Sequence, residues 1–587
     1  MEEHPVFATN DKWVRDGVER QVRDGESRCI GGVVAPDFGL ASPNHSTGTP
    51  VAMAIWAAAL CHPRSRYYRD PELADRLALA AGYMLRAQHE DGTISPGWTN
   101  FHSPPDTAFV VVGLAQVCEL LERDGWERLR PAAADIRLFL RRTIPALVSG
   151  GVHTPNHRWV MCAALGFLWE RFGAREALGR AREWLAEGMD ATPDGEWTER
   201  SNGIYNAVSD TMLAHAARLL GRPELLEPVR ANLRMMTYLI HPDGEVVTDY
   251  SGRQDFGQKH DLSAYYLPYA MLAHEDGDPL FQAAADLALG LLRHPGSAPA
   301  NAAVRLLLDP RLQQPAVPPA ELPTEYRVLI NGRFPRERYL AEMAGAGHHG
   351  RIEHSRLHPD FGAAVARVRR GRTSVTVSAE TPSFFALRHG EARLLGVQVA
   401  SYFGPGFVPM NRLTPADGGY LLAGEQQKGY YGPVPAPLLP PTAGEPVSPW
   451  YLLPHHRRPQ THVQRHRVEA EVRETADGWE MAVRSAEPEE AVAQISLLLP
   501  ADASVSGGDL APAGPGTWFW KAGALRLEAG GDWIGLDGGG AHEHTAAGVR
   551  EAHYPARCRT LLINVVTPFE RRIRIRLSPD GTAGEKT

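Results

Sequence analysis

Two short polar segments of this 587-residue chain carry side chains that could act together on an anionic substrate. Residues 154–159 read Thr-Pro-Asn-His-Arg-Trp, and residues 200–206 read Arg-Ser-Asn-Gly-Ile-Tyr-Asn. Each segment leads into a stretch with helical periodicity, and Pro155 suits the first turn of the first helix. Unpaired N–H groups and the helix dipole favour an anion at such a terminus. Taken singly, each segment is also explained as an ordinary helix start, with a surface histidine in the first and a packed Tyr205 in the second.

The side chains of Asn156, His157 and Tyr205 together suit proton abstraction beside a carboxylate, as in β-elimination from a uronic acid. The C5 proton of a uronate is weakly acidic, because the neighbouring carboxylate is already negative. Its removal requires donors that neutralise this carboxylate, which an amide, a protonated imidazole or a guanidinium can supply. A base must take the proton and an acid must protonate the departing O4, and a tyrosine can perform either step. The chemistry therefore requires that these residues meet in one pocket.

The elements that must position these groups are helices. Residues 49–308 carry apolar side chains at intervals of three and four. Glycine-marked turns recur, about one helix pair apart, at Asp91-Gly92, Gly150-Gly151, Asp194-Gly195 and Asp243-Gly244. Such pairs bury their apolar faces by stacking on neighbouring pairs. We expect an incomplete (α/α) toroid rather than an extended solenoid, because the loops after the turns are aromatic and polar and would gather on one rim.

The loops on this rim supply the candidate substrate-binding residues. Aromatic faces pack on sugar rings and polar side chains bind hydroxyl groups. The candidates are Trp98, His102, Arg158, Trp159, Arg200, Asn202, Tyr250 and Arg253. For any one of them, internal packing is the more ordinary role.

A change of composition divides the chain. Residues 310–325 are rich in proline and have no helical period, so residues 1–309 are predicted to form the catalytic toroid and 310–325 a linker. Residues 326–587 contain short alternating runs with β-branched side chains, separated by Gly, Pro and Asp. This pattern predicts a large antiparallel β-sandwich.

A helical toroid followed by an antiparallel β domain resembles the heparinase II/III-like and alginate-lyase-like polysaccharide lyases. The matching residues are Asn156-His157 at a helix start and Tyr205 in the next helical repeat. The resemblance implies that Asn156 neutralises the carboxylate, that His157 is a base or neutraliser, and that Tyr205 is the acid, or both acid and base in a syn elimination. It also implies a histidine from the first strands of the β domain, for which His349 and His354 are the candidates.

The histidines and cysteines do not form a clear metal site. The five cysteines include no CxxC pair and are expected to be buried free thiols. His354, His358 and Asp360 lie close together, and a second cluster comprises His455, His456, His462 and His466, but neither has the spacing of a zinc site. Because arginines interleave the second cluster, a basic anion-binding loop is an equal explanation. We therefore predict no cofactor, with a structural metal in the β domain as an alternative.

Two other functions fit the same elements. A toroid glycoside hydrolase, for example one like unsaturated glucuronyl hydrolase, would use carboxylates such as Asp106, Asp194 and Asp210. Asp106 is equally explained as a helix N-cap and Asp194 as a turn residue. A carbohydrate-binding protein would keep the aromatic rim without needing Asn156, His157 and Tyr205 together.

Composition limits the partners. The net charge of −8 and the absence of a basic stripe argue against nucleic acid. The first residues lack the features of a signal peptide, and no apolar run is long enough for a membrane span, so we expect a cytoplasmic chain with no membrane partner. The expected partner is an acidic poly- or oligosaccharide, bound in a locally basic cleft. A homo-oligomer is compatible with the sequence.

Overall fold

The computed structural model describes residues 4–346, 358–441, 450–540, 545–555 and 558–579. The chain divides into two compact units, a helical unit of Met1–Pro323 with Arg333–Gly362 and a β unit of Thr324–Gly332 with Ala363–Thr587. The chain therefore enters the β unit, returns to the helical unit and leaves it again. As a result, the segment that carries α13 groups with the helices, although the sequence assigns it to the β domain.

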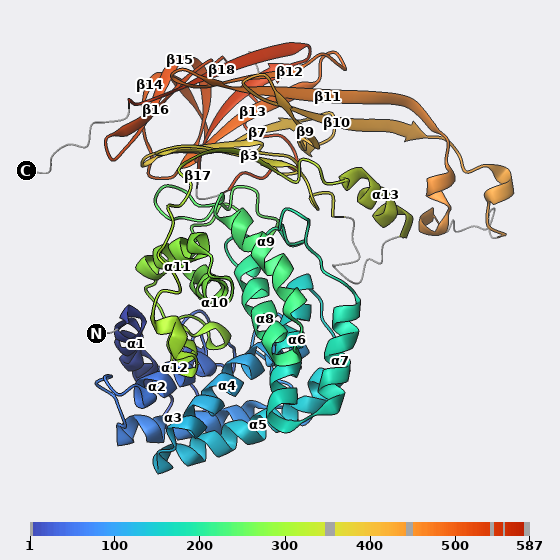
Figure 1. Cartoon of the computed structure of the whole chain (residues 1–587). Helices are drawn as coiled ribbons and strands as arrows, with labels where there is room; N and C mark the ends of the chain where they lie inside the picture. Colours follow the sequence, from blue (N-terminus) through green and yellow to red (C-terminus); the bar gives the residue numbers. More distant parts are fainter. Residues whose placement is uncertain (1–3, 347–357, 442–449, 541–544, 556–557, 580–587) are drawn as a thin grey trace, which may run out of the picture. The chain divides into compact units, whose positions relative to one another are not determined.

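The helical unit contains every described α-helix (Figure 1). These are α1 (Pro5–Arg20), α2 (Thr49–Cys61), α3 (Pro71–Ala87), α4 (Pro104–Asp124), α5 (Arg130–Ser149), α6 (Pro155–Phe172), α7 (Arg175–Ala186), α8 (Tyr205–Leu220), α9 (Leu226–Met236), α10 (Tyr266–Asp276), α11 (Pro279–Leu291), α12 (Ala302–Leu308) and α13 (Arg336–Ala346). It also holds the short hairpin of β1 (Val34–Ala35) and β2 (Leu40–Ala41).

The helices form an inner and an outer layer, as an (α/α) toroid requires. In the inner layer, α2 packs on α4, α4 on α6, α6 on α8 and α8 on α10. Each inner helix also packs on the outer helix that follows it in the chain. Every residue of α2 is buried, and α4, α6 and α8 are buried on nearly all sides. The helix α4 is long and apolar enough to span a membrane, but 89% of that window is buried inside the unit, as expected for a core helix. This arrangement confirms the predicted toroid.

Local sequence signals set the ends of these helices. Prolines occupy the first turn of α2, α3, α4, α6 and α11, where the missing N–H costs nothing. Four of the inner helices end at glycines in the left-handed conformation, which a residue without Cβ adopts most easily. These glycines are Gly125 after α4, Gly173 after α6, Gly221 after α8 and Gly277 after α10.

Three of the predicted glycine turns form the same tight hairpin. Gly92, Gly195 and Gly244 have φ of +86°, +97° and +83°, and each donates its N–H to the carbonyl three residues earlier. A Cβ on Gly92 would lie 2.2 Å from a backbone oxygen of α5, and one on Gly195 would lie 2.4 Å from the backbone of α9. Only glycine fits there without displacement. The fourth turn differs, because Gly150 has φ of −72° and caps α5 instead.

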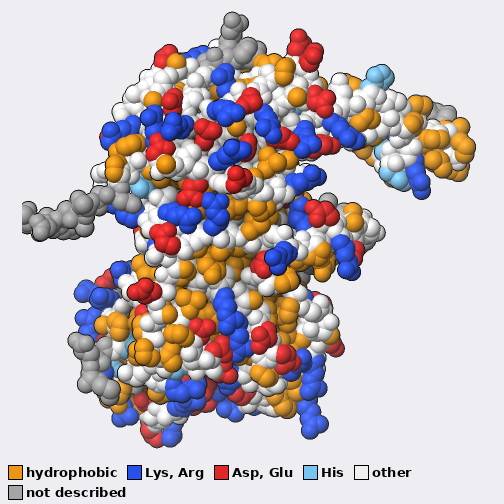
Figure 2. Space-filling view, turned by 45° about the horizontal axis from the view of Figure 1, so that its top comes forward, with side chains coloured by type: hydrophobic (Ala, Val, Ile, Leu, Met, Phe, Trp, Pro, Cys, Tyr) orange, Lys and Arg blue, Asp and Glu red, His pale blue; other side chains and the backbone are white. Residues whose placement is uncertain are grey.

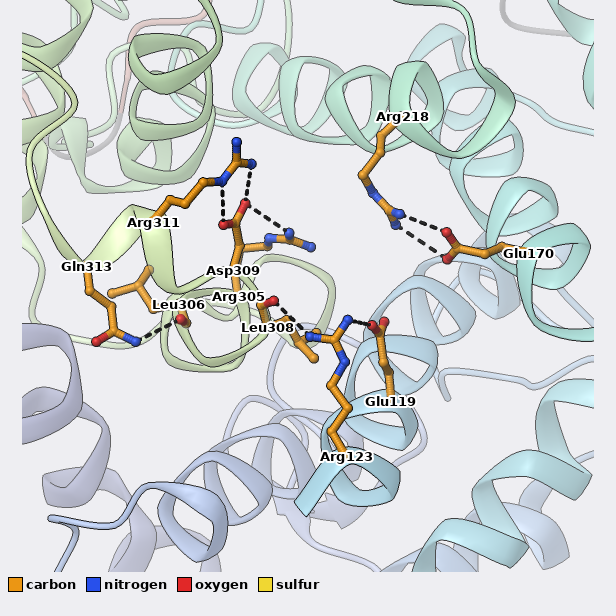
Figure 3. Close-up of polar contacts among 10 residues, drawn as sticks. All are labelled: Glu119, Arg123, Glu170, Arg218, Arg305, Leu306, Leu308, Asp309, Arg311 and Gln313. Atoms are coloured by element: carbon orange, nitrogen blue, oxygen red, sulfur yellow. Dashed lines mark hydrogen bonds and ion pairs between the residues drawn. The ribbon is translucent and has the colours of Figure 1, made fainter. Parts of the chain in front are cut away.

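Arginines tie helices of the toroid to one another (Figure 3). Arg123 near the end of α4 donates to the carbonyl of Leu308 at 3.0 Å, which joins α4 to α12. Arg218 of α8 pairs with Glu170 of α6 at 2.8 Å. These cations lie near helix C-termini, where the helix dipole favours positive charge.

The β unit is one continuous, curled sheet. Its strands are β3 (Glu325–Ile330), β4 (Val365–Arg370), β5 (Thr373–Ser378), β6 (Phe385–His389), β7 (Ala392–Ser401), β8 (Gly406–Phe407), β9 (Arg412–Ala416), β10 (Gly419–Tyr431), β11 (Gln460–Thr475), β12 (Gly478–Ser485), β13 (Val492–Pro500), β14 (Ser504–Gly514), β15 (Thr517–Ala529), β16 (Asp532–Asp537), β17 (Cys558–Val566) and β18 (Phe569–Leu577). The order is β3-β4-β5-β6-β7-β13-β17-β15-β16-β18-β12-β11-β10-β9, with β14 on β15 and β8 on β7.

Curling brings two parts of this sheet face to face. All described pairs are antiparallel except β15 with β17, and β16 contacts β6 and β7 across the interior. The core between the faces includes Leu387, Val397, Val483, Leu497 and Ile575, all fully buried. The predicted antiparallel β domain is therefore present, with its two layers joined as one sheet.

A long hairpin extends from this sheet (Figure 1). Strands β10 and β11 stay paired from Gly419↔Arg473 to Tyr431↔Gln460. Their outer neighbours β9 and β12 pair only with residues 419–423 and 469–475. Residues 425–431 and 460–467 therefore form a two-stranded arm.

Candidate functional site

The first turn of α6 is bound to the loop that precedes α8. Asn156 is the second residue of α6, and both its backbone N–H and its side-chain amide donate to Oε2 of Glu199, at 2.9 and 2.6 Å. Glu199 lies in the segment after the Gly195 hairpin, six residues before Tyr205 begins α8. The two predicted segments therefore meet through a carboxylate that the sequence analysis does not select.

The same carboxylate holds a cation beside the tyrosine. Arg253 forms an ion pair with Oε1 of Glu199, and its guanidinium lies 4.7 Å from the centre of the Tyr205 ring. The side-chain amide of Gln254 donates to the phenol oxygen of Tyr205. Asn156, Glu199, Arg253 and Tyr205 thus form one connected cluster, which brings together three of the residues predicted from the sequence.

Burial governs the electrostatics of Glu199. Only 5% of its side chain is exposed, and this burial raises the pKa of the carboxyl group. The charge of Arg253 and the hydrogen bonds from Asn156 oppose the shift. The carboxylate is therefore held by partners on two sides, and the ion pair with Arg253 depends on its negative charge.

The amide of Asn156 is already engaged as a donor. Its nitrogen donates to Glu199 and to Oγ1 of Thr154, the latter at 3.2 Å. Its oxygen is buried and has no hydrogen-bond partner among the described residues. The contact with a carboxylate fixes this amide orientation, because a carbonyl oxygen there would be repelled. Asn156 therefore presents an acceptor, not a donor, and the predicted neutralisation of a substrate carboxylate by this amide is not available in this arrangement.

His157 adjoins the cluster as a neutral imidazole. The ring packs edge-on against Phe109 at 6.0 Å and against His153 at 4.7 Å between centroids. Burial, with smaller contributions from His153, His45 and Arg253, lowers the pKa of His157 to about 3. Burial therefore favours the neutral imidazole of His157 near neutral pH, and its role as a base or neutraliser stays a prediction.

A mostly apolar cavity of about 400 Å³ lies near these residues, although Asn156, His157, Glu199, Tyr205 and Arg253 are not among those that line it. It is lined by Phe109, which packs on His157, and by Gly203 and Ile204, which immediately precede Tyr205. Its remaining walls come from α8, from the start of α10 and from residues 292–302. The helical unit thus places a hollow of sugar-sized dimensions near the cluster.

Four predicted substrate-binding residues are packed inside the helical unit instead. Trp159, Arg200, Asn202 and Tyr250 are each at most 1% exposed. Trp159 packs on Trp197 with 6.2 Å between centroids. These side chains cannot contact a sugar without local unfolding, so their predicted role is corrected.

Two of these residues instead fix the loop that carries Arg253. Arg200 pairs with Glu196 at 3.2 Å and stacks over the Tyr250 ring at 4.9 Å. Asn202 donates to the carbonyl of Val247 at 2.9 Å. Arg200 and Asn202 therefore fix the position of the loop that carries Arg253.

Arg158 is also engaged elsewhere. It pairs with Glu187 at 3.1 Å and with Asp190 at 3.0 Å, and 12% of its side chain is exposed. Its guanidinium lies over the Trp159 ring. These contacts hold α6 to the end of α7, which replaces the predicted role in substrate binding.

The first rim loop keeps its candidates accessible. Trp98 is partly exposed and packs on Phe38 at 4.8 Å between centroids. His102 is largely exposed, binds Asp91 at 2.8 Å and stacks on His89. Their role in sugar binding stays a prediction. His349 and His354 lie outside the described residues.

Metal ligation finds no support in the part of the chain that the structure describes. There, no group of three or more His, Cys, Asp or Glu side chains could hold a metal ion. His455 and His462 instead contact aromatic rings on the arm, at Trp450 and Tyr430.

Two of the three carboxylates proposed for the alternative hydrolase are buried and hydrogen-bonded. The Asp106 carboxylate accepts hydrogen bonds from the Ser103 hydroxyl and the Asn100 amide at the start of α4. Asp210 is fully buried beside Nε1 of Trp197, and burial raises its pKa well above the ordinary value. Asp194 is exposed in its hairpin.

Comparison by sequence finds no match: no protein-family model and no curated protein matches the chain. Comparison by structure finds heparinase III, with 10% identity and a TM-score of 0.50 over 90% of this chain and 76% of the other. Xanthan lyase from Paenibacillus has 10% identity and a TM-score of 0.54 over 99% of this chain and 57% of the other. Chondroitin AC lyase from Streptomyces coelicolor A3 has 13% identity and a TM-score of 0.46, over 98% and 80%. The chain has the heparinase-like fold of polysaccharide lyases.

Proposed function

We propose that this chain is a polysaccharide lyase that cleaves a uronic-acid-containing glycan by β-elimination. The observation that carries the proposal is the surroundings of Tyr205: the Arg253 guanidinium lies over its ring and the Gln254 amide donates to its hydroxyl oxygen. Glu199 connects Arg253 to Asn156. This cluster lies near a cavity in a helical unit whose fold is that of polysaccharide lyases.

We assign proton transfer to Tyr205. Its phenolate oxygen takes the C5 proton, the electrons of the C5–H bond form the C4=C5 double bond, and the C4–O4 bond breaks. The phenol then gives the proton to the departing O4, which makes the elimination syn. The Arg253 guanidinium over the ring and the Gln254 amide at the oxygen support this role, because both stabilise negative charge there.

We assign neutralisation of the uronate carboxylate to Arg253. Its side chain is 28% exposed and binds Glu199 through one terminal nitrogen, which leaves further N–H donors for a substrate. Asn156 is 1% exposed, so we assign it the positioning of Glu199 and not a contact with the sugar, whereas the partly exposed, neutral imidazole of His157 can form a hydrogen bond with the substrate. This division differs from the one that the sequence suggests, because the Asn156 donors already bind Glu199 and Thr154.

The hydrolase alternative has no comparable support. An inverting or retaining glycosidase needs two carboxyl groups facing one sugar. Among Asp106, Asp194 and Asp210, only Asp194 has an exposed side chain.

The test is ultraviolet absorbance of the new C4–C5 double bond on a panel of uronate-containing glycans. We expect the wild-type chain to produce this chromophore and Tyr205→Phe to lose about a hundredfold or more in kcat, with binding retained. Tyr68→Phe, a partly exposed tyrosine between α2 and α3, is the matched control. Glycan cleavage without the chromophore, or full activity of Tyr205→Phe, would contradict the proposal.

A further inference from the structure

The end of the β10–β11 arm exposes an unusual number of large apolar side chains. We call residues 426–441 and 450–465 the arm tip. The exposed fractions there are 94% for Tyr451, 82% for Leu452, 70% for Tyr430, 64% for Tyr431 and 54% for Trp450. In Figure 2 orange side chains gather at this projecting end, with histidines and cations beside them. Exposed apolar groups at this density mark a binding surface.

The arm tip is basic, although the chain as a whole carries a net charge of −8. Between residues 426 and 465 the sequence contains Lys428, Arg457, Arg458 and Arg465. The one acidic residue in that span, Glu445, lies outside the described residues. Glu425, just before the span, pairs with Arg465 at 3.6 Å, which leaves Lys428, Arg457 and Arg458 in excess. The charge of the arm tip therefore favours an anionic ligand.

One arginine organises the aromatic surface. Arg458 donates to the carbonyl of Gly432 at 2.9 Å and to Nδ1 of His455 at 3.1 Å. Its guanidinium lies 4.8 Å from the centre of the Trp450 ring, and His455 contacts the Trp450 carbonyl at 2.5 Å. The Arg458 guanidinium thus packs on the Trp450 ring and joins the segment after β10, at Gly432, to the segment before β11.

We propose that the arm tip, a surface of the β unit, binds an acidic polysaccharide. The choice of an acidic sugar rests on the proposed function. Exposed rings of tyrosine and tryptophan pack on the C–H faces of sugars, and guanidinium groups bind carboxylates in a bidentate manner. Interleaved rings and cations match a polymer that alternates apolar ring faces with charges. A lipid bilayer fits less well, because insertion of Trp450 would carry the Arg458 guanidinium toward the hydrocarbon.

The experiment measures binding to immobilised alginate and heparin, with dextran as the neutral polymer. It uses the full chain carrying Tyr205→Phe, so that the polymer is not consumed. We expect Tyr430→Ala with Tyr451→Ala, and separately Arg457→Ala with Arg465→Ala, to weaken binding roughly tenfold or more. Arg550→Ala, at an exposed arginine elsewhere in the β unit, should leave binding unchanged. Binding by the parent chain should weaken with salt and be absent on dextran.

Several results would overturn the inference. One is unchanged affinity of both arm-tip variants for the acidic polymers, and another is equal binding to dextran. A third is arm-dependent binding to phosphatidylserine vesicles, or an arm-dependent change of mass by light scattering, without any effect on polysaccharide binding. The two proposals fail separately: a chain that forms no C4–C5 double bond but needs the arm tip for polysaccharide binding refutes the lyase function alone.

Discussion

Replacing Glu199 by glutamine should separate the two halves of the candidate site while preserving its shape. Glutamine keeps an oxygen that can accept from the backbone and side chain of Asn156. It removes the charge that holds Arg253, so the guanidinium loses its fixed place over the Tyr205 ring. The change therefore tests whether this carboxylate positions the cation that we assign to catalysis.

The magnitude follows from burial. A hydrogen bond to a charged partner contributes about 1.5–3 kcal/mol, and breaking a buried pair costs more. Because 28% of the Arg253 side chain is exposed, water can solvate it, and we expect about 2 kcal/mol of lost stability in the helical unit. A similar loss in the transition state corresponds to a decrease of about 30-fold in kcat.

The assays are chemical denaturation of the full chain and initial rates of double-bond formation at saturating substrate. Glu187→Gln is the matched control, because its partner Arg158 also pairs with Asp190 and 49% of the Glu187 side chain is exposed. It should change stability by about 0.5 kcal/mol or less and leave kcat unchanged. Unchanged kcat in Glu199→Gln with lowered stability would reduce Glu199 to a structural residue, and no change in either would refute the network itself.

Two further predictions concern His157 and two tryptophans. Since the pKa of His157 is about 3 in the folded state and ordinary in the unfolded state, protons bind the unfolded chain preferentially and stability should fall as pH decreases below 6.5. Between pH 6 and pH 5 the free energy of unfolding, measured by chemical denaturation, should decrease by about 1 kcal/mol less in His157→Gln than in the wild type. Equal decreases would contradict the buried neutral imidazole. Trp159→Ala should cost about 3–5 kcal/mol of stability, whereas Trp98→Ala should change stability little and raise KM, so a stable Trp159→Ala with raised KM would reverse our correction.

The convergence of Asn156 and Tyr205 could be predicted because their segments occupy equivalent points of consecutive helix pairs. Helical periodicity and the glycine turns carry that information locally. Trp159 could not be placed by the same means, since α6 is buried on nearly all sides and shows no amphipathic face. Arg200 was misplaced because a charged residue is expected at the surface, and its partner Glu196 is recognised only in the folded loop.

Other features depend on contacts between distant residues. Glu199 lacks a sequence signal of its own, because its function is to join Asn156 with Arg253, which lies 54 positions further along the chain. The joining of the two β layers into one sheet depends on pairs such as β7 with β13 and β15 with β17. Strand periodicity predicts that such strands exist but not which strands pair.

The hairpins at Gly92, Gly195 and Gly244 hold the helix pairs of the toroid together independently of the rim loops that follow them. Each is closed by main-chain hydrogen bonds and lies against the next outer helix, so no side chain of the loop that follows is needed to hold it. Mutation can therefore exchange, lengthen or shorten one loop while neighbouring repeats stay unaltered. Such modularity is compatible with a chain that shares the fold of heparinase III at 10% sequence identity.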